Sequence, residues 1–316
     1  MKLKDLGEHE FIRSVLFKYV DAKELTDAYS YQGKSYKIDG FQLSYTYPFM
    51  SLFDLGWKAV TSTASDLITT GSIPRLLLVS IGISPEYSVN DLELIIKGIR
   101  SASTYYGFKY VGGDLNSSSA NGWIDVVGIG DNICEQHSGV SNKDKVIITG
   151  EVGFTSKIFM KYYFKLDIKP DYISLLKVKH PIVNRNLIDF QKTFCKDIVG
   201  ASDLSDGILI TLDQITQRLK IGIKLNLIPI RQTIIKELSQ YGFNELDILK
   251  FSGEEYESIF IVKEQKLSLM LAWLHKRGIK AKVIGEVDTN KATQGSVVYN
   301  GEKIKIEGWD NFKGWF

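Results

Sequence analysis

Strand-like apolar runs alternate with helix-like segments in both halves of this 316-residue chain. The run of consecutive apolar residues within 75–84 is typical of a strand that is buried on both faces. The segment 88–106 that follows is predicted as a helix, because it ends at Gly107 and glycine favours a helix C-terminus. Strands and helices mixed in this way predict an α/β or α+β architecture.

The same criteria predict the remaining elements. In the N-terminal half we expect an amphipathic helix over 8–20, strands within 29–49, a helix from Asp54 as N-cap to Thr70, and two strands within 108–131. In the C-terminal half we expect strands over 146–149, 222–227, 258–263 and 280–286, and helices over 155–165, 182–194, 207–220, 230–240 and 264–277.

A polar stretch over 135–145 separates the two halves and precedes a new strand. Exposed polar linkers of this kind are typical of domain boundaries. At about 100–200 residues per domain, the length also favours two domains. We therefore predict an N-terminal domain over 1–137 and a C-terminal domain over 138–316.

Composition and charge exclude several classes of protein. With 44% hydrophobic residues and a formal net charge of only +2, the chain does not resemble a disordered protein. The near-neutral charge also gives no global attraction to nucleic acid or an anionic membrane, so we expect neither partner. The N-terminus is charged where a signal peptide would be apolar, and the apolar stretch 76–83 is too short to span a bilayer. We expect a soluble, cytoplasmic protein.

Cysteine and histidine are sparse. Cys134 and Cys195 lie far apart in the sequence, and the four histidines are scattered. These spacings predict neither a structural zinc site nor a disulfide framework, and they give little support to a nucleophilic triad.

Five places along the chain combine an acidic residue with glycine or other small residues. They are Leu-Thr-Asp-Ala at 25–28, Ala-Ser-Asp-Leu at 64–67, Gly-Gly-Asp-Leu-Asn-Ser at 112–117, Ser-Asp-Leu-Ser-Asp-Gly at 202–207 and Ser-Gly-Glu-Glu-Tyr-Glu at 252–257. Mg²⁺ prefers a few carboxylates and takes its other ligands from water and substrate phosphates. Glycines such as Gly112 and Gly113 let backbone N–H groups approach an anion closely. The pattern therefore favours a magnesium and phosphate site.

Each place alone also has a purely structural interpretation. Asp66 would solvate or cap a helix, and residues 112–114 would form an ordinary turn. Ser205 and Asp206 would cap the helix that follows them. Glu254, Glu255 and Glu257 would form a solvated acidic face. Only the order and spacing of the five places distinguish between the two interpretations.

Taken in order, four segments resemble the thiamine-monophosphate kinase family of the aminoimidazole-ribonucleotide-synthetase-like superfamily. They are Trp57–Pro74, the Gly-Gly-Asp at 112–114, Asp203–Gly207 and Ser252–Glu257, and the resemblance extends from Gly7 to the aromatic tail around Trp309 and Phe312. It implies transfer of the γ-phosphate of ATP to thiamine monophosphate, giving thiamine diphosphate, with Mg²⁺. It also implies a homodimer, in which an N-terminal α/β domain dimerises through its sheet and a C-terminal α/β domain follows.

The resemblance also assigns roles to individual residues. It implies metal ligands at Asp27, Asp66, Asp114, Asp203 and Asp206, nucleotide contacts at Gly113, Asp114 and Ser205, substrate contacts at Glu254 and Trp309, and a catalytic role for Asp206. Phosphoryl transfer between two phosphates brings several negative charges together, and catalysis is mainly positioning and charge neutralisation by cations. A nearly neutral chain without basic clusters would use its acids to hold those cations.

The N-terminal half departs from the family pattern. Leu25 and Thr26 replace the first Gly-Asp of a Gly-Asp-Asp motif, Gly40 and Phe41 align with a Thr-Asp pair, Pro48 with a histidine, and His137 with an arginine. On a strand, Asp39 would share a face with Phe41, so a two-residue shift of register would restore one carboxylate. Three readings stay open: an active kinase with fewer or rearranged metals, a paralogue acting on another phosphate acceptor, and an inactive ATP-binding dimer.

Overall fold

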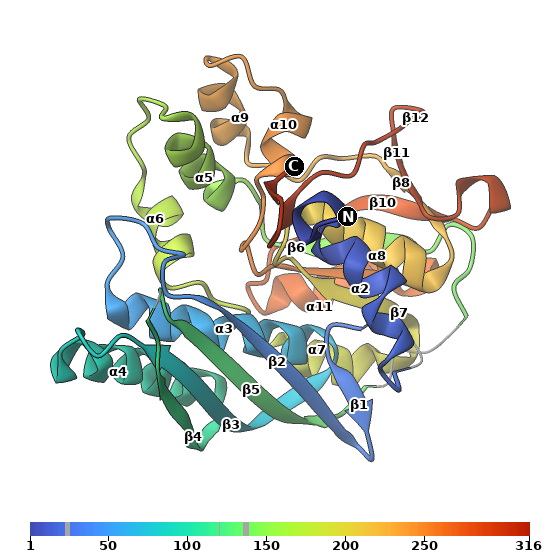
Figure 1. Cartoon of the computed structure of the whole chain (residues 1–316). Coiled ribbons are helices and arrows are strands. Elements are labelled where there is room, and N and C mark those ends of the chain that lie inside the picture. The colour runs from blue at the N-terminus through green and yellow to red at the C-terminus, as the bar shows by residue number, and fades with distance from the viewer. Residues whose placement is uncertain (23–25, 120, 135–138) are drawn as a thin grey trace. The chain divides into compact units, whose positions relative to one another are not determined.

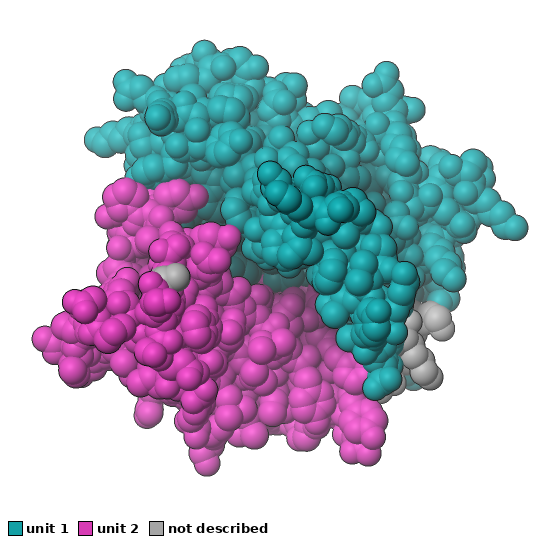
Figure 2. All heavy atoms as spheres, viewed as in Figure 1, with its two compact units in different colours: residues 1–26, 137–178, 196–316 teal, residues 27–136, 179–195 magenta. Residues whose placement is uncertain are grey.

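The computed structural model describes residues 1–22, 26–119, 121–134 and 139–316. The chain divides into two compact units, which Figure 2 colours separately. Unit 1 comprises residues 1–26, 137–178 and 196–316, and unit 2 comprises residues 27–136 and 179–195. Each unit has its own mixed sheet with helices, so the predicted α/β class with two sheet-containing parts is confirmed. The predicted boundary at 137/138 falls outside the described residues and stays a prediction.

Unit 2 is built on a five-stranded sheet with the order β1-β2-β5-β3-β4 (Figure 1). Its strands are β1 (Tyr29–Tyr31), β2 (Lys34–Gln42), β3 (Ser72–Ile83), β4 (Lys109–Ser117) and β5 (Trp123–Asn132). Only β3 and β4 are parallel, and the helix between them makes the crossover that a parallel pair requires. The helices are α3 (Leu52–Thr69), α4 (Val89–Tyr106) and α7 (Leu187–Phe194).

Helix α3 is nearly all buried and packs against α4. It begins after Ser51, whose Oγ accepts a hydrogen bond from the backbone N–H of Asp54 at 3.3 Å. Asp54 therefore completes a capping box instead of being the N-cap that the sequence predicted. A Cβ atom on Gly56 would lie 2.1 Å from the carbonyl oxygen of Ile95, so glycine at this position permits the close helix contact.

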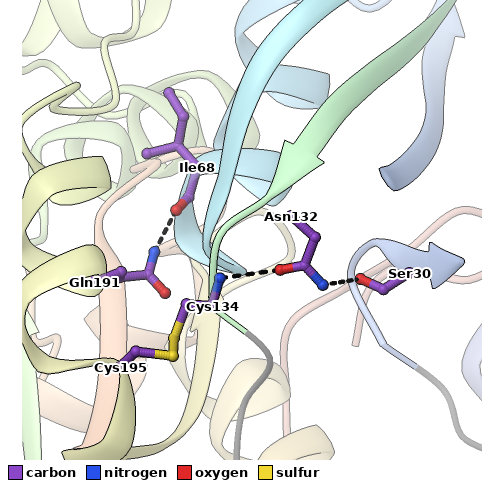
Figure 3. Close-up of a disulfide and its surroundings, with 6 residues drawn as sticks. All are labelled: Ser30, Ile68, Asn132, Cys134, Gln191 and Cys195. Carbon is purple, nitrogen blue, oxygen red and sulfur yellow. Dashed lines mark hydrogen bonds between the residues drawn. A yellow bond between two sulfur atoms is a disulfide. The ribbon is translucent and has the colours of Figure 1, made fainter. Parts of the chain in front are cut away.

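Within unit 2, buried contacts and one covalent bond join the segment 179–195 to residues 27–136. Cys134 and Cys195 form a disulfide, so the expectation of no disulfide framework was wrong (Figure 3). Their separation of 61 residues hid the pair, because only the fold brings β5 and the end of α7 together. Beside them the Gln191 amide donates to the carbonyl oxygen of Ile68. The indole Nε1 of Trp57 donates to the carbonyl of Pro181 at 2.9 Å.

Unit 1 is built on a seven-stranded sheet with the order β12-β11-β8-β10-β6-β9-β7, in which only β11 and β8 are parallel. Its strands are β6 (Lys145–Thr149), β7 (Ile198–Asp203), β8 (Gly222–Leu225), β9 (Ser258–Val262), β10 (Ala281–Asp288), β11 (Ser296–Tyr299) and β12 (Glu302–Lys303). The completely buried β7 and β9 lie side by side at one edge. A separate hairpin joins β13 (Trp309–Asp310) and β14 (Gly314–Trp315).

The helices of unit 1 surround this sheet. They are α1 (Leu3–Leu6), α2 (Glu8–Ser14), α5 (Phe154–Phe164), α6 (Tyr172–Lys179, its last residue in unit 2), α8 (Ile208–Leu219), α9 (Gln232–Ser239), α10 (Glu245–Lys250) and α11 (Leu267–Lys276). Single turns of 3₁₀ helix lie at Leu16–Lys18, Cys195–Asp197, Glu264–Lys266 and Lys291–Thr293. None of the helices in the described ranges is both long enough and apolar enough to cross a bilayer.

Most predicted elements are present, and the errors are local. The predicted helix over 182–194 begins only at Leu187, because residues 181–186 form an irregular segment in which the Asn184 side chain accepts from the backbone N–H of Asn186. The predicted helix over 8–20 ends at Ser14 and continues as a 3₁₀ turn. Helices α1, α6 and α10 and strands β7 and β11 to β14 were not predicted.

Candidate functional site

Unit 2 brings two of the predicted metal ligands together. Asp27 precedes β1, and Asp66 lies near the C-terminal end of α3 with a relative exposure of only 4%. Their carboxylate oxygens lie within 4.8 Å of each other. Atom Oδ2 of Asp27 is buried and accepts no hydrogen bond from any described residue. Asp66 is therefore not the solvated or capping helix residue of the structural interpretation.

A lysine that the sequence did not single out faces this pair of acids. The Nζ atom of Lys37, on β2, lies 3.0 Å from Oδ2 of Asp66. Burial opposes the charged form of Lys37, but Asp66, Asp39 and Asp27 outweigh it and raise the pKa of the lysine above its usual value. Lys37 is therefore an ammonium ion at neutral pH.

Asp39 occupies the same face of β2 as Lys37 and Phe41. The segment is a strand, as the register argument required, and alternate residues share a face. The Nζ of Lys58 on α3 lies 5.3 Å from the centre of the Phe41 ring, which shows that this face is turned towards α3. Asp39 thus supplies a carboxylate on the side of the sheet where Asp66 lies.

Asp114 lies elsewhere in unit 2. It is exposed on the edge strand β4, where it pairs with Ser80 of β3. Ser80 also pairs with Asp125 of β5, and Asp125 pairs with Gly40 of β2, so these four residues form one row across the sheet. Gly40 alternates with Asp39 and Phe41, so this row faces away from α3. Within unit 2, the structure therefore does not bring Asp114 and the neighbouring Gly113 together with Asp66. Burial, and then Asp39, raise the pKa of Asp125.

Unit 1 brings together the two acidic segments of the C-terminal half. Asp203 is the last residue of β7, residues 204–207 follow it, and residues 252–257 precede β9. The two segments continue the pairing between these strands. The backbone N–H of Glu254 donates to the carbonyl of Ser205 at 2.7 Å, and that of Tyr256 donates to the carbonyl of Leu204 at 3.0 Å. Asp203, Ser205 and Asp206 therefore lie beside the Glu254 segment.

The hydroxyl of Ser252 also joins these segments. It accepts a hydrogen bond from the backbone N–H of Ile208, the first residue of α8, at 3.0 Å. Within the described residues, the N-cap of α8 is Gly207, with no capping side chain of its own. Ser205 and Asp206 are thus not the N-caps that the structural interpretation offered.

Glu255 is completely buried. Its Oε1 accepts hydrogen bonds from the backbone N–H groups of Gly153 at 2.7 Å and Thr155 at 3.0 Å, at the start of α5. Burial raises the pKa of Glu255, although Lys177 and these N–H groups oppose the rise. A solvated acidic face at 254–257 is therefore excluded.

Lys177 completes this buried group. Its Nζ lies 2.6 Å from Oε1 of Glu257 and donates to the backbone carbonyl of Glu255 at 3.1 Å. Burial opposes its charge, but Glu257 and Glu255 raise the pKa of Lys177.

Glu254 and Tyr256 both have a positive φ, 58° and 50°, which is unfavourable for residues other than glycine. Surrounding contacts must hold such a conformation, and strained backbone of this kind clusters at functional sites.

The aromatic tail also reaches this region of unit 1. The backbone N–H of Trp309 donates to the carbonyl of Asp206 at 3.1 Å, and the ring of Trp309 lies 5.3 Å from that of Trp315. Trp315 in turn contacts Phe159 and Phe251. The sequence singled out Trp309 but not Trp315. The only sequence feature that marks Trp315 is the glycine that precedes it, Gly314.

The carboxylates suit a magnesium ion in their chemistry. Asp27 offers a buried oxygen with no described partner, and Asp66 offers one next to it. Hard oxygen ligands of this kind are those that Mg²⁺ prefers.

Of the positions that depart from the family pattern, Leu25 and His137 lie outside the described residues. Thr26 is exposed, and Pro48 lies in the loop between β2 and α3.

Comparisons with known proteins confirm the resemblance noted in the sequence. A thiamine-monophosphate kinase of Aquifex aeolicus (strain VF5) is 24% identical over 99% of this chain and 100% of its own length. The solved structure of AaThiL complexed with AMPPCP and TMP superposes with a TM-score of 0.81, at 22% identity over 98% of this chain and 99% of its own. The HypE-HypF complex matches with a TM-score of 0.73, at 22% identity over 94% and 99% of the two chains.

Two family models cover most of the chain. The AIR synthase related protein, N-terminal domain, matches residues 29–131, and the corresponding C-terminal domain matches residues 143–298. Both matched ranges contain predicted site residues, Asp66 in the first and Asp206 in the second. The chain belongs to the AIR synthase related family.

Proposed function

We propose that this chain is a thiamine-monophosphate kinase, which transfers the γ-phosphate of ATP to the phosphate of thiamine monophosphate and releases thiamine diphosphate and ADP. The observation that carries the proposal is similarity to a kinase of that name over 99% of this chain and all of the relative. The acids found in the sequence agree with it, because Asp66, Asp114, Asp203, Asp206 and Glu254 are retained in a chain that departs from the family pattern at other positions.

The proposed metal ligands are Asp27, Asp66, Asp203 and Asp206, together with Asp114, which would bind a separate ion because it lies on the other face of the unit 2 sheet from Asp66. Bound Mg²⁺ would neutralise phosphate oxygens and orient the transferred group. Asp206 is proposed as the catalytic carboxylate, and Gly113, Asp114 and Ser205 as nucleotide contacts. The small side chains beside these acids leave room for phosphate groups.

Glu254 and Trp309 are proposed to contact thiamine monophosphate. Thiamine carries a positively charged thiazolium ring, which a carboxylate and an aromatic face both attract. Glu254 and Trp309 each bond to the segment 205–206 through the backbone. The buried Glu255 and Lys177 hold the strained backbone on which Glu254 lies, so they act as positioning residues.

We also propose a homodimer formed through the sheet of unit 2. The face of this sheet that turns away from α3 exposes apolar side chains, among them Ile38 at 64%, Tyr36 at 39% and Leu76 at 38%. Exposed apolar patches of this kind mark interaction surfaces. The substitution Ile38→Asp should convert the dimer to monomers, measured by light scattering, whereas Val89→Asp on the first turn of α4 should not. We place this enzyme in the cytoplasm, where ATP is supplied.

A second candidate is a paralogue that phosphorylates another acceptor. The match to HypE-HypF favours it, since that protein has a different name and the same fold. Thr26, which replaces a carboxylate of the family pattern, also favours it.

The test is incubation of the purified chain with ATP, Mg²⁺ and thiamine monophosphate, followed by chromatography of the thiamine compounds. Formation of thiamine diphosphate supports the proposal. ADP release without thiamine diphosphate would favour the paralogue, and nucleotide binding without turnover would favour an inactive dimer. A parallel incubation without thiamine monophosphate measures background ATP hydrolysis.

A further inference from the structure

The acids of unit 2 already have a cation among them. Lys37 reaches them from the middle of β2, and its Nζ lies 3.0 Å from Oδ2 of Asp66. The lysine side chain is 23% exposed and that of Asp66 only 6%.

The position of this ammonium is one that a metal ion would also take. The oxygens of Asp27 and Asp66 lie within 4.8 Å of each other, and Asp39 shares the face of β2 with Lys37. Neighbouring carboxylates disfavour each other's ionised form, and a cation beside them relieves this repulsion. Three carboxylates with one ammonium leave two negative charges, which a single divalent cation neutralises.

The sequence supports the same interpretation. Thr26 replaces the acid that would precede Asp27 in the resembling family, so the segment that supplies Asp27 has one carboxylate fewer. Loss of an anionic ligand and provision of an internal cation change the local charge in the same direction. Together they lower the demand for divalent ions.

We infer that the ammonium of Lys37 fills one cation position among Asp27, Asp39 and Asp66, so that this chain binds one divalent ion fewer there than a chain without the lysine. This inference rests on the proposed use of these acids as metal ligands. Lys37 is then a positioning residue that keeps Asp66 in place before substrates arrive.

The test is Mn²⁺ binding to the nucleotide-free protein, measured from the electron paramagnetic resonance signal of free Mn²⁺. The substitution Lys37→Met removes the charge and keeps the length of the side chain. We expect the variant to bind one additional Mn²⁺ per chain, or to bind Mn²⁺ at least about tenfold more tightly, which corresponds to about 1.4 kcal/mol. If Lys37→Met binds the same number of Mn²⁺ ions as the wild type, and binds them less than about tenfold more tightly, the inference is overturned.

Two controls locate the effect. Lys34→Met removes a lysine of the same strand that pairs with Asp131 outside the acid cluster, and it should leave Mn²⁺ binding unchanged. Adding Asp66→Asn to Lys37→Met should abolish the gain, and a gain that persists would also overturn the inference. If melting shows that Lys37→Met is unfolded, Lys37→Gln takes its place. Because ATP and thiamine monophosphate are absent, an inactive kinase would not affect this result.

Discussion

Two buried acids, Asp66 in unit 2 and Glu255 in unit 1, are stabilised by different means. In unit 2, Asp66 pairs with the side chain of Lys37. In unit 1, Glu255 accepts hydrogen bonds from two backbone N–H groups at the start of α5, and Lys177 reinforces them. A side-chain cation can be exchanged for another cation, whereas backbone N–H groups cannot leave. The comparison teaches that the surroundings of Asp66 are suited to exchange of cations and those of Glu255 to a fixed geometry.

The largest expected effect concerns the covalent bond of unit 2. Replacing Cys134 and Cys195 by serine opens a link between residues 61 apart, and the loss of that constraint on the unfolded chain should cost about 4 kcal/mol of unfolding free energy. Urea denaturation measures it. Because the chain has two cysteines, a reductant should destabilise the wild type and leave the double variant unchanged. Equal stability of variant and wild type would show that the bond contributes nothing.

The next effect concerns catalysis in unit 1. Asp206→Asn removes a charge and keeps the shape of the side chain, so kcat should fall about 10²–10³-fold. Asp167→Asn, at an exposed position of the same unit, is the matched control and should keep its activity. Thermal melting checks that both variants are folded. Wild-type turnover by the Asp206 variant would contradict its assigned role.

The third effect tests how much Lys177 contributes to holding the buried glutamates of unit 1. Lys177→Met leaves Glu255 and Glu257 without their cation, and breaking a buried pair of this kind costs about 3 kcal/mol. Lys305→Met removes an exposed pair with Glu307 and should cost less than about 1 kcal/mol. Chemical denaturation measures both. If backbone N–H groups alone held Glu255, the two substitutions would cost the same.

The smallest effect is a dependence on pH. Burial raises the pKa of Glu255 in the folded state, so the folded protein holds this proton more tightly than the unfolded chain does. The carboxyl therefore makes its most favourable contribution at a pH below the ordinary pKa of glutamate, and that contribution falls as pH rises towards the raised value. Glu255→Gln should remove this decline. Urea titrations from pH 4.5 upwards should show the variant gaining stability relative to wild type, and parallel curves would contradict the prediction.

The sequence predicted much of the fold because its strongest patterns are local. Helix α4 and strand β3 were found from periodicity, an apolar run and a terminal glycine. Strand β7 was missed, since the run Ile198–Asp203 mixes apolar residues with glycine and serine and its burial comes from neighbours distant in the sequence. The disulfide was missed for the same reason.

The candidate site was predicted in part. The order and spacing of acids beside small residues singled out Asp66, Asp206 and Glu254, and the structure places Asp66 in a buried position beside Asp27. The sequence did not identify Lys37, because a single lysine on a strand has no distinguishing neighbours until α3 packs over it. It also treated Glu255 as a solvated acid, since nothing local shows that its carboxylate reaches the first turn of α5.

The most direct test of the whole account is the balance of products in one incubation with ATP, Mg²⁺ and thiamine monophosphate. The account predicts ADP and thiamine diphosphate in equal amounts, and neither product after chelation of the metal. ADP that accumulates without thiamine diphosphate, or product formed at full rate in the presence of a chelator, would contradict it.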